Sequence, residues 1–74
     1  MDLRDVFAVN LRKIRNAKGL SQDALAYDAE VSRSYLSQLE KGTYYASLRV
    51  IERLAKVLRV EPAEFLRPIR RSQR

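Results

Sequence analysis

A helix-start pattern recurs three times along this chain and restricts it to short, closely spaced helices. Ser21, Ser32 and Ser47 each carry a side-chain oxygen that can accept a hydrogen bond from an orphaned backbone N–H at a helix N-terminus. Each serine follows an apolar residue and has another apolar residue four positions later, which is the spacing of a hydrophobic staple. A further start lies at residues 61–62, where proline occupies the first helical position. No stretch alternates apolar and polar residues as a half-buried strand would, so the sequence predicts an all-α fold.

The predicted helix ends are also marked by residue type. Gly19 and Gly42 each follow a lysine, and each is suited to the left-handed conformation that ends many helices. We therefore expect a compact five-helix bundle, with helices at about 3–18, 22–28, 33–41, 48–58 and 62–67. Apolar residues at three- to four-residue spacing mark the expected buried faces. They are Leu3, Phe7, Leu11 and Ile14, then Leu25, Ala26 and Ala29, then Leu36 and Leu39, and finally Leu48, Ile51, Leu54, Ala55 and Leu58.

The length and charge distribution predict one domain and a basic tail. We assign residues 1–66 to a single domain and residues 67–74 to the tail, which holds four arginines and no acidic residue. The net charge of the whole chain is +6, so the tail supplies most of it. A basic excess suits a polyanion such as nucleic acid or an anionic membrane surface, and we expect the tail to contact phosphates. The alternative is a tail that only increases solubility.

The composition argues against several classes of protein. Without histidine or cysteine the chain lacks the usual zinc ligands and a nucleophile–base pair, and it has no glycine-rich phosphate loop. We therefore expect no enzyme activity, no metal, no cofactor and no small-molecule ligand. No apolar run approaches the roughly 18 residues of a membrane span, and no signal peptide is evident. The sequence thus predicts a soluble, cytoplasmic protein that does not associate with a membrane.

Only residues 29–32 separate the second expected helix from the third. So short a connection forces the two helices into a sharp corner, which is typical of the helix-turn-helix but also occurs in purely structural bundles. The outward face of the third helix favours the helix-turn-helix, because all its side chains are able to form hydrogen bonds and none is acidic. Arginine matches the O6/N7 edge of guanine, and glutamine matches the N6/N7 edge of adenine. The residues of this face are Arg33, Ser34, Ser37, Gln38 and Lys41.

Residues 20–26 (LSQDALA) and 31–42 (VSRSYLSQLEKG) resemble the signature of the Cro/C1 helix-turn-helix family, which includes the phage repressors and the Xre-type regulators. Residues 11–15 (LRKIR) and 47–55 (SLRVIERLA) fit the same pattern, so the resemblance extends from about residue 7 to residue 66. It implies a lambda-repressor-like bundle whose second and third helices form the helix-turn-helix. It also implies a sequence-specific transcriptional regulator, such as a repressor, that binds double-stranded DNA.

The resemblance also implies roles for individual residues. Arg33, Ser34, Ser37 and Gln38 would read base edges. The residues expected at the DNA backbone are Gln22, Ser32, Lys41, Thr43 and Tyr44, with Ser32 acting mainly as a helix cap. Arg15 and Glu40 match a partly buried ion pair that ties the first helix to the third.

At two positions the sequence departs from the family pattern. Glu30 stands where the family usually has glycine, so we expect a left-handed glutamate in the corner. Tyr45 and Ala46 stand where Asn-Pro is frequent, and Tyr45 either packs in the core or lies near DNA.

We expect a homodimer formed through the region of the fourth and fifth helices. This region carries an apolar surplus: Val50, Val57, Val60, Leu66 and Ile69. A two-fold dimer would place two recognition helices about 34 Å apart and would read a palindromic operator. The alternative is that these residues complete the core of a monomer. A controller of a restriction–modification or toxin–antitoxin operon fits this description, whereas an antitoxin or adaptor acting mainly through protein contacts is the alternative function.

Overall fold

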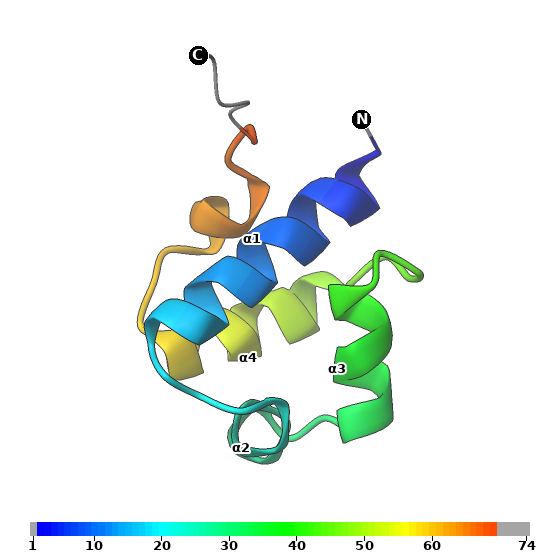
Figure 1. Cartoon of the computed structure of the whole chain (residues 1–74). Helices are drawn as coiled ribbons and strands as arrows, with labels where there is room; N and C mark the ends of the chain where they lie inside the picture. Colours follow the sequence, from blue (N-terminus) through cyan, green and yellow to red (C-terminus); the bar gives the residue numbers. More distant parts are fainter. Residues whose placement is uncertain (1, 70–74) are drawn as a thin grey trace.

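The computed structural model describes residues 2–69, and within this range it contains four α-helices, one 3₁₀ helix and no strand (Figure 1). The elements are α1 (Leu3–Ala17), α2 (Gln22–Ala29), α3 (Arg33–Glu40), α4 (Leu48–Leu58) and η1 (Pro62–Leu66). α1 contacts both α3 and η1, α2 contacts α3 and α4, and α4 also contacts η1. The all-α prediction is therefore confirmed.

The prediction of a fifth α-helix was wrong. The backbone N–H of Glu64 donates to the carbonyl of Glu61 at 2.9 Å, and Arg67 donates to Glu64 at 3.5 Å, both with the three-residue spacing of a 3₁₀ helix. η1 has only five residues, and its first residue, Pro62, has no N–H to donate. A five-residue segment can form very few hydrogen bonds with the four-residue spacing of an α-helix. It adopts the tighter 3₁₀ winding instead and ends at Leu66.

The predicted serine caps are confirmed. The Oγ atoms of Ser21, Ser32 and Ser47 accept hydrogen bonds from the backbone N–H three residues later, at 3.0, 3.0 and 3.1 Å. Gly19 and Gly42 are left-handed, with φ of 73° and 79°. Local capping chemistry therefore explains most of the helix boundaries.

Two residues other than glycine also adopt the left-handed conformation. Glu30 ends α2 with φ of 61°, as its position in the corner predicted. Arg59 ends α4 with φ of 58°, and its N–H donates to the carbonyl of Lys56 at 3.3 Å. Nothing in the sequence marked Arg59, because the residue that usually signals such a helix end is glycine or asparagine.

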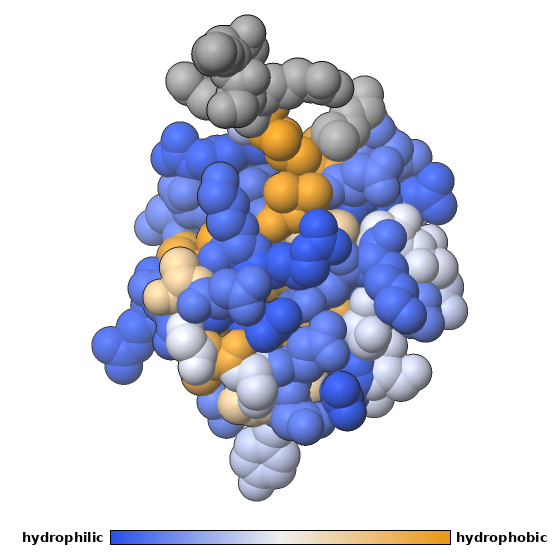
Figure 2. Space-filling model, in the orientation of Figure 1, coloured by the Kyte–Doolittle hydropathy of each residue, from blue (hydrophilic) through white to orange (hydrophobic). Residues whose placement is uncertain are grey.

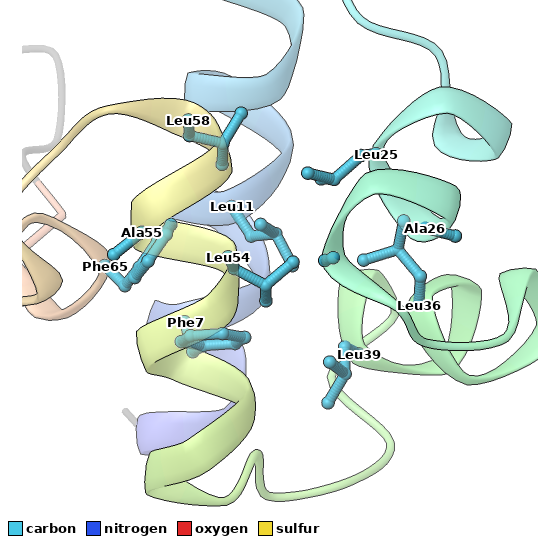
Figure 3. Packing of buried hydrophobic residues seen from close by; sticks show 11 residues of the cluster. Phe7, Leu11, Leu25, Ala26, Leu36, Leu39, Leu54, Ala55, Leu58 and Phe65 are labelled. Atoms are coloured by element: carbon cyan, nitrogen blue, oxygen red, sulfur yellow. The ribbon is translucent and has the colours of Figure 1, made fainter.

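Buried side chains from all five elements meet in one core (Figure 3). Phe7 of α1 and Phe65 of η1 form an aromatic pair, with ring centroids 5.3 Å apart and planes tilted by 55°. Leu3 and Leu48 were predicted to be buried, but they are 58% and 84% exposed. Each is the first residue of its helix and lies at the edge of the core. The core comprises Phe7, Leu11, Leu25, Ala26, Ala29, Leu36, Leu39, Leu54, Ala55, Leu58 and Phe65.

A buried asparagine fastens the C-terminal segment to α1. Asn10 donates through Nδ2 to the carbonyl of Phe65 at 2.9 Å and to that of Arg67 at 3.0 Å. These bonds satisfy two carbonyls at the end of η1, so Asn10 is buried without an unpaired amide nitrogen. No local sequence signal marks Asn10, because both of its acceptors lie more than fifty residues away in the chain.

Asp2 caps α1, and its ionisation is linked to the stability of the fold. Its Oδ1 accepts from the backbone N–H of Arg4 at 2.7 Å, and its Oδ2 lies 2.9 Å from Nη2 of the same residue. The hydrogen bond from the Arg4 side chain and then that from its N–H lower the pKa of Asp2 from 3.8 to about 2. Because the folded pKa is the lower one, this stabilisation is complete above pH 3.8 and is lost as the pH falls through about 2.

We therefore expect Asp2→Ala to lower the melting temperature near neutral pH, and we expect the difference from the parent protein to shrink as the pH falls from about 4 to about 2. Thermal melts of the two proteins followed by circular dichroism would measure this difference. A difference that stays constant over this pH range would contradict the assignment.

Candidate DNA-binding surface

Three residues join α2 to α3 and make a sharp corner. Glu30 turns the backbone through its left-handed conformation, and the N–H of Val31 donates to the carbonyl of Ala26 at 3.0 Å. Val31 packs against the core, and Ser32 begins the next helix as its N-cap. In Figure 1, α2 is seen along its axis whereas α3 is seen from the side, so the two helices cross steeply. This arrangement has the geometry of a helix-turn-helix.

The two faces of α3 differ sharply in chemistry. Leu36 and Leu39 are fully buried and fix the orientation of the helix. On the outward side, four polar side chains line one shallow surface hollow: Arg33, Ser34, Ser37 and Gln38. Arg33 and Ser34 are exposed, whereas Ser37 and Gln38 are half-buried. All four predicted base-reading residues are therefore neighbours on one surface.

Four of the five residues predicted to hold the DNA backbone lie at or just beyond the two ends of α3. Ser32 is exposed at the N-terminus of α3, and Lys41 is exposed at its C-terminus. Thr43 and Tyr44 follow in the loop, and the Tyr44 ring stacks on Tyr35 of α3, with ring centroids 6.1 Å apart and planes 20° apart. The stacking holds this loop against α3.

The N-terminal part of α1 supports the same loop. Arg4 Nη1 donates to the carbonyl of Thr43 at 3.5 Å, and its guanidinium lies 4.8 Å from the centre of the Tyr45 ring. Tyr45 is 68% exposed, so core packing does not account for it. Arg4 could not be predicted from local spacing, because these partners lie about forty residues away in the chain.

A buried ion pair links α1 to α3. Arg15 Nε lies 2.7 Å from Glu40 Oε2, and Arg15 Nη2 donates to Glu40 Oε1 at 3.1 Å. The two side chains are 13% and 3% exposed. Arg15 Nη1 also donates to the carbonyl of Leu20 at 2.8 Å, and Arg12 Nη1 donates to the backbone carbonyl of Glu40. These charged contacts fix α3 relative to α1.

Gln22, the predicted phosphate ligand on α2, joins this ion pair. Its Nε2 donates to Glu40 Oε1 at 3.0 Å, which makes Glu40 a shared acceptor for α1 and α2. An amide nitrogen carries two hydrogens, so Gln22 keeps a second donor at the N-terminus of α2. Among residues 2–69, no buried side-chain nitrogen or oxygen lacks a hydrogen-bond partner.

Arg33 has an acidic neighbour that the sequence analysis did not identify. Its Nε lies 3.4 Å from Oδ1 of Asp23, on the second residue of α2. Both side chains are largely exposed, at 63% for Arg33 and 75% for Asp23. The two residues are ten positions apart on different helices, so only the corner brings them together.

The basic tail is only partly described. Arg67 Nε lies 2.7 Å from Glu64 Oε1, so its charge is paired within the domain, and Glu64 has a lowered pKa because it accepts hydrogen bonds from Arg67. The predicted phosphate contacts of residues 70–74 lie outside the described residues. Residues 2–69 include no helix with the length and apolar character needed to cross a bilayer.

A steep two-helix corner whose second helix presents a polar outward face is typical of a helix-turn-helix DNA-binding domain. The chain belongs to this family: the family model described as "Helix-turn-helix domain" matches residues 6–67. The control protein C.BamHI of Bacillus amyloliquefaciens is 38% identical over 66 residues, which span 88% of this chain and 82% of that protein.

Two solved structures extend the comparison. The restriction-modification controller protein C.AhdI of Aeromonas hydrophila has a TM-score of 0.81 and 42% identity, over 84% of this chain and 94% of that one. A hypothetical transcription factor of Neisseria has a TM-score of 0.86 and 39% identity, over 90% and 77%. The chain is thus a DNA-binding transcriptional regulator of the Cro/C1 type and not an enzyme.

Proposed function

We propose that α3 enters the major groove of double-stranded DNA and reads its sequence through Arg33 and Gln38. One observation carries this proposal, namely that the four predicted base-reading side chains line a single hollow on the outward face of α3. Arginine suits guanine and glutamine suits adenine, because each pairs with two atoms of that base edge. The short side chains of Ser34 and Ser37 let the helix approach the bases closely.

The surrounding residues position the helix on the duplex. Lys41, Thr43 and Tyr44 bind phosphates beyond the C-terminus of α3, and Ser32 lies at its N-terminus. Gln22 binds a phosphate at the N-terminus of α2, where the backbone N–H groups and the helix dipole favour an anion. These contacts fix the register, and the base contacts then supply the specificity.

We further propose a homodimer formed through the region of α4 and η1. Val50, Val57 and Val60 pack partly against the core of the monomer. The support for a dimer comes instead from Leu66 of η1, which is 45% exposed. Figures 1 and 3 place η1 and α3 on opposite sides of the molecule, so a second copy here leaves both recognition helices accessible. Figure 2 shows a mostly hydrophilic face with small apolar areas.

A substitution on this surface tests the dimer. We expect Leu66→Asp to convert the dimer to a monomer, because a carboxylate buried in an apolar interface is strongly disfavoured. Sedimentation equilibrium would measure the change in mass. Tyr27→Asp is the matched control, because Tyr27 is 84% exposed on α2 and lies outside this region. The interface is wrong if Leu66→Asp leaves the dimer intact, or if the parent protein is monomeric at micromolar concentration.

The relatives suggest the regulated genes. Two of them are named as a control protein and a restriction-modification controller protein. We infer that this chain controls transcription of a restriction–modification operon, acting on DNA in the bacterial cytoplasm.

Selection of bound duplexes from a random pool tests the proposed function. We expect a palindrome whose half-site centres are about 34 Å apart, one turn of duplex. Binding to this duplex should exceed binding to unrelated duplexes at the same salt concentration by about a thousandfold or more. Recovery of no motif, with weak binding that falls uniformly as salt rises, would contradict sequence reading and favour a role in protein contacts.

A further inference from the structure

The pair between Asp23 and Arg33 contributes little to the stability of the fold. The two side chains are 75% and 63% exposed, and the closest atoms, Asp23 Oδ1 and Arg33 Nε, are 3.4 Å apart. Ion pairs in such exposed positions are weakened by water and salt. The position of the pair is more informative, because Arg33 lies in the hollow proposed to face the bases.

The atom that Asp23 engages determines which atoms of Arg33 remain for DNA. The guanidinium group is planar and the Asp23 carboxylate lies on its Nε side, so the attraction between the two charges favours orientations in which the edge formed by Nη1 and Nη2 points away from Asp23. This edge carries parallel donors that match O6 and N7 of guanine. We propose that Asp23 is a positioning residue that determines specificity by orienting Arg33 toward guanine. The proposal rests on the proposed function of α3.

Binding to DNA strengthens this orientation. When the duplex covers Arg33, water is displaced and the local dielectric constant falls, so the attraction between the two side chains increases. A flexible arginine would instead turn toward a neighbouring phosphate, which attracts it in every sequence. Asp23 opposes that contact, because its own charge repels phosphates.

This argument predicts two opposite effects of Asp23→Ala. Loss of a negative charge near DNA strengthens binding to unrelated duplexes, whereas loss of the carboxylate beside Nε reduces the preference for guanine. A residue that contributed only charge would change the affinity for all duplexes by the same factor. A purely structural residue in the first turn of α2 would change the melting temperature without changing the base preference.

The test uses the full chain and the highest-affinity duplex recovered by selection, together with its single-base-pair variants. We expect Asp23→Ala to reduce the preference for guanine at the pair read by Arg33 by about tenfold, while binding to an unrelated duplex becomes tighter. Asp28→Ala is the matched control, because it removes an exposed acid of α2 that has no ion pair to Arg33. It should leave the base preference unchanged.

The same substitution in an Arg33→Ala background separates the possible failures. If Asp23 acts through Arg33, the double variant has the base preference of Arg33→Ala alone. An unchanged preference in Asp23→Ala would overturn the proposal, as would a further loss in the double variant, which would mean that Asp23 contacts a base itself. If Arg33→Ala retains the full preference for guanine, the assignment of Arg33 as a reader fails first, and the role of Asp23 fails with it.

Discussion

Replacing Glu40 by alanine is expected to lower the free energy of unfolding by about 3–5 kcal/mol. The substitution leaves Arg15, whose side chain is only 13% exposed in the parent protein, without its carboxylate partner. It also removes the acceptor of the Gln22 amide. An uncompensated buried charge costs far more than an intact pair contributes, because the pair has already lost its hydration. Domains of this kind have about 5–15 kcal/mol of stability in total, so this loss is large.

Urea denaturation of the parent protein and of Glu40→Ala measures the effect. The informative control replaces both partners, Arg15→Met with Glu40→Met, which removes the charge together with its partner and fills the space with apolar side chains. We expect this double variant to be more stable than Glu40→Ala alone. A loss below about 1 kcal/mol in Glu40→Ala would show that the pair is solvated in solution.

Replacing Phe65 by alanine is expected to lower the free energy of unfolding by about 3–5 kcal/mol. Phe65 is fully buried, and it is the only core side chain contributed by η1 among the described residues. The substitution removes its contact with Phe7 and leaves a cavity between α1 and α4. It also loosens the carbonyl that Asn10 binds, so we expect the segment after α4 to detach first.

Leu66→Ala is the matched control for this variant, because its side chain is adjacent in the chain but 45% exposed. We expect it to change the stability by less than about 1 kcal/mol when measured below the dimerisation concentration. Hydrogen exchange of the η1 amides adds a local measurement, with faster exchange expected in Phe65→Ala. Equal losses of stability in the two variants would contradict the assignment of Phe65 as the anchor of η1.

Local chemistry made most of the fold predictable. The caps at Ser21, Ser32 and Ser47 were predictable because a cap depends on neighbours within four residues. The left-handed residues Gly19 and Gly42 were predictable for the same reason. The same information could not distinguish an α-helix from a 3₁₀ helix at 62–66, because both begin with the same signals. Nor could it predict that the first residue of a helix lies beyond the core, as Leu48 does.

The outward face of α3 was predictable because Leu36 and Leu39 fix the helix rotation, and this places Arg33 and Gln38 on the other side. The contacts between helices were not predictable from spacing alone. Asp23 reaches Arg33 only because of the sharp corner between α2 and α3. Gln22 reaches Glu40 only because the N-terminus of α2 lies close to the C-terminus of α3.

The central claim is that Arg33 reads a base whereas Lys41 holds the backbone, and one set of titrations tests it most directly. Fluorescence anisotropy would measure the affinities of the parent protein, Arg33→Ala and Lys41→Ala for the selected duplex and for its single-base-pair variants at fixed salt. We predict that Arg33→Ala abolishes the preference at one base pair of each half-site, worth about 1–3 kcal/mol, whereas Lys41→Ala weakens binding to every duplex alike. If Arg33→Ala also weakened all duplexes by the same factor and kept every base preference, α3 would contact DNA without reading it in the proposed way.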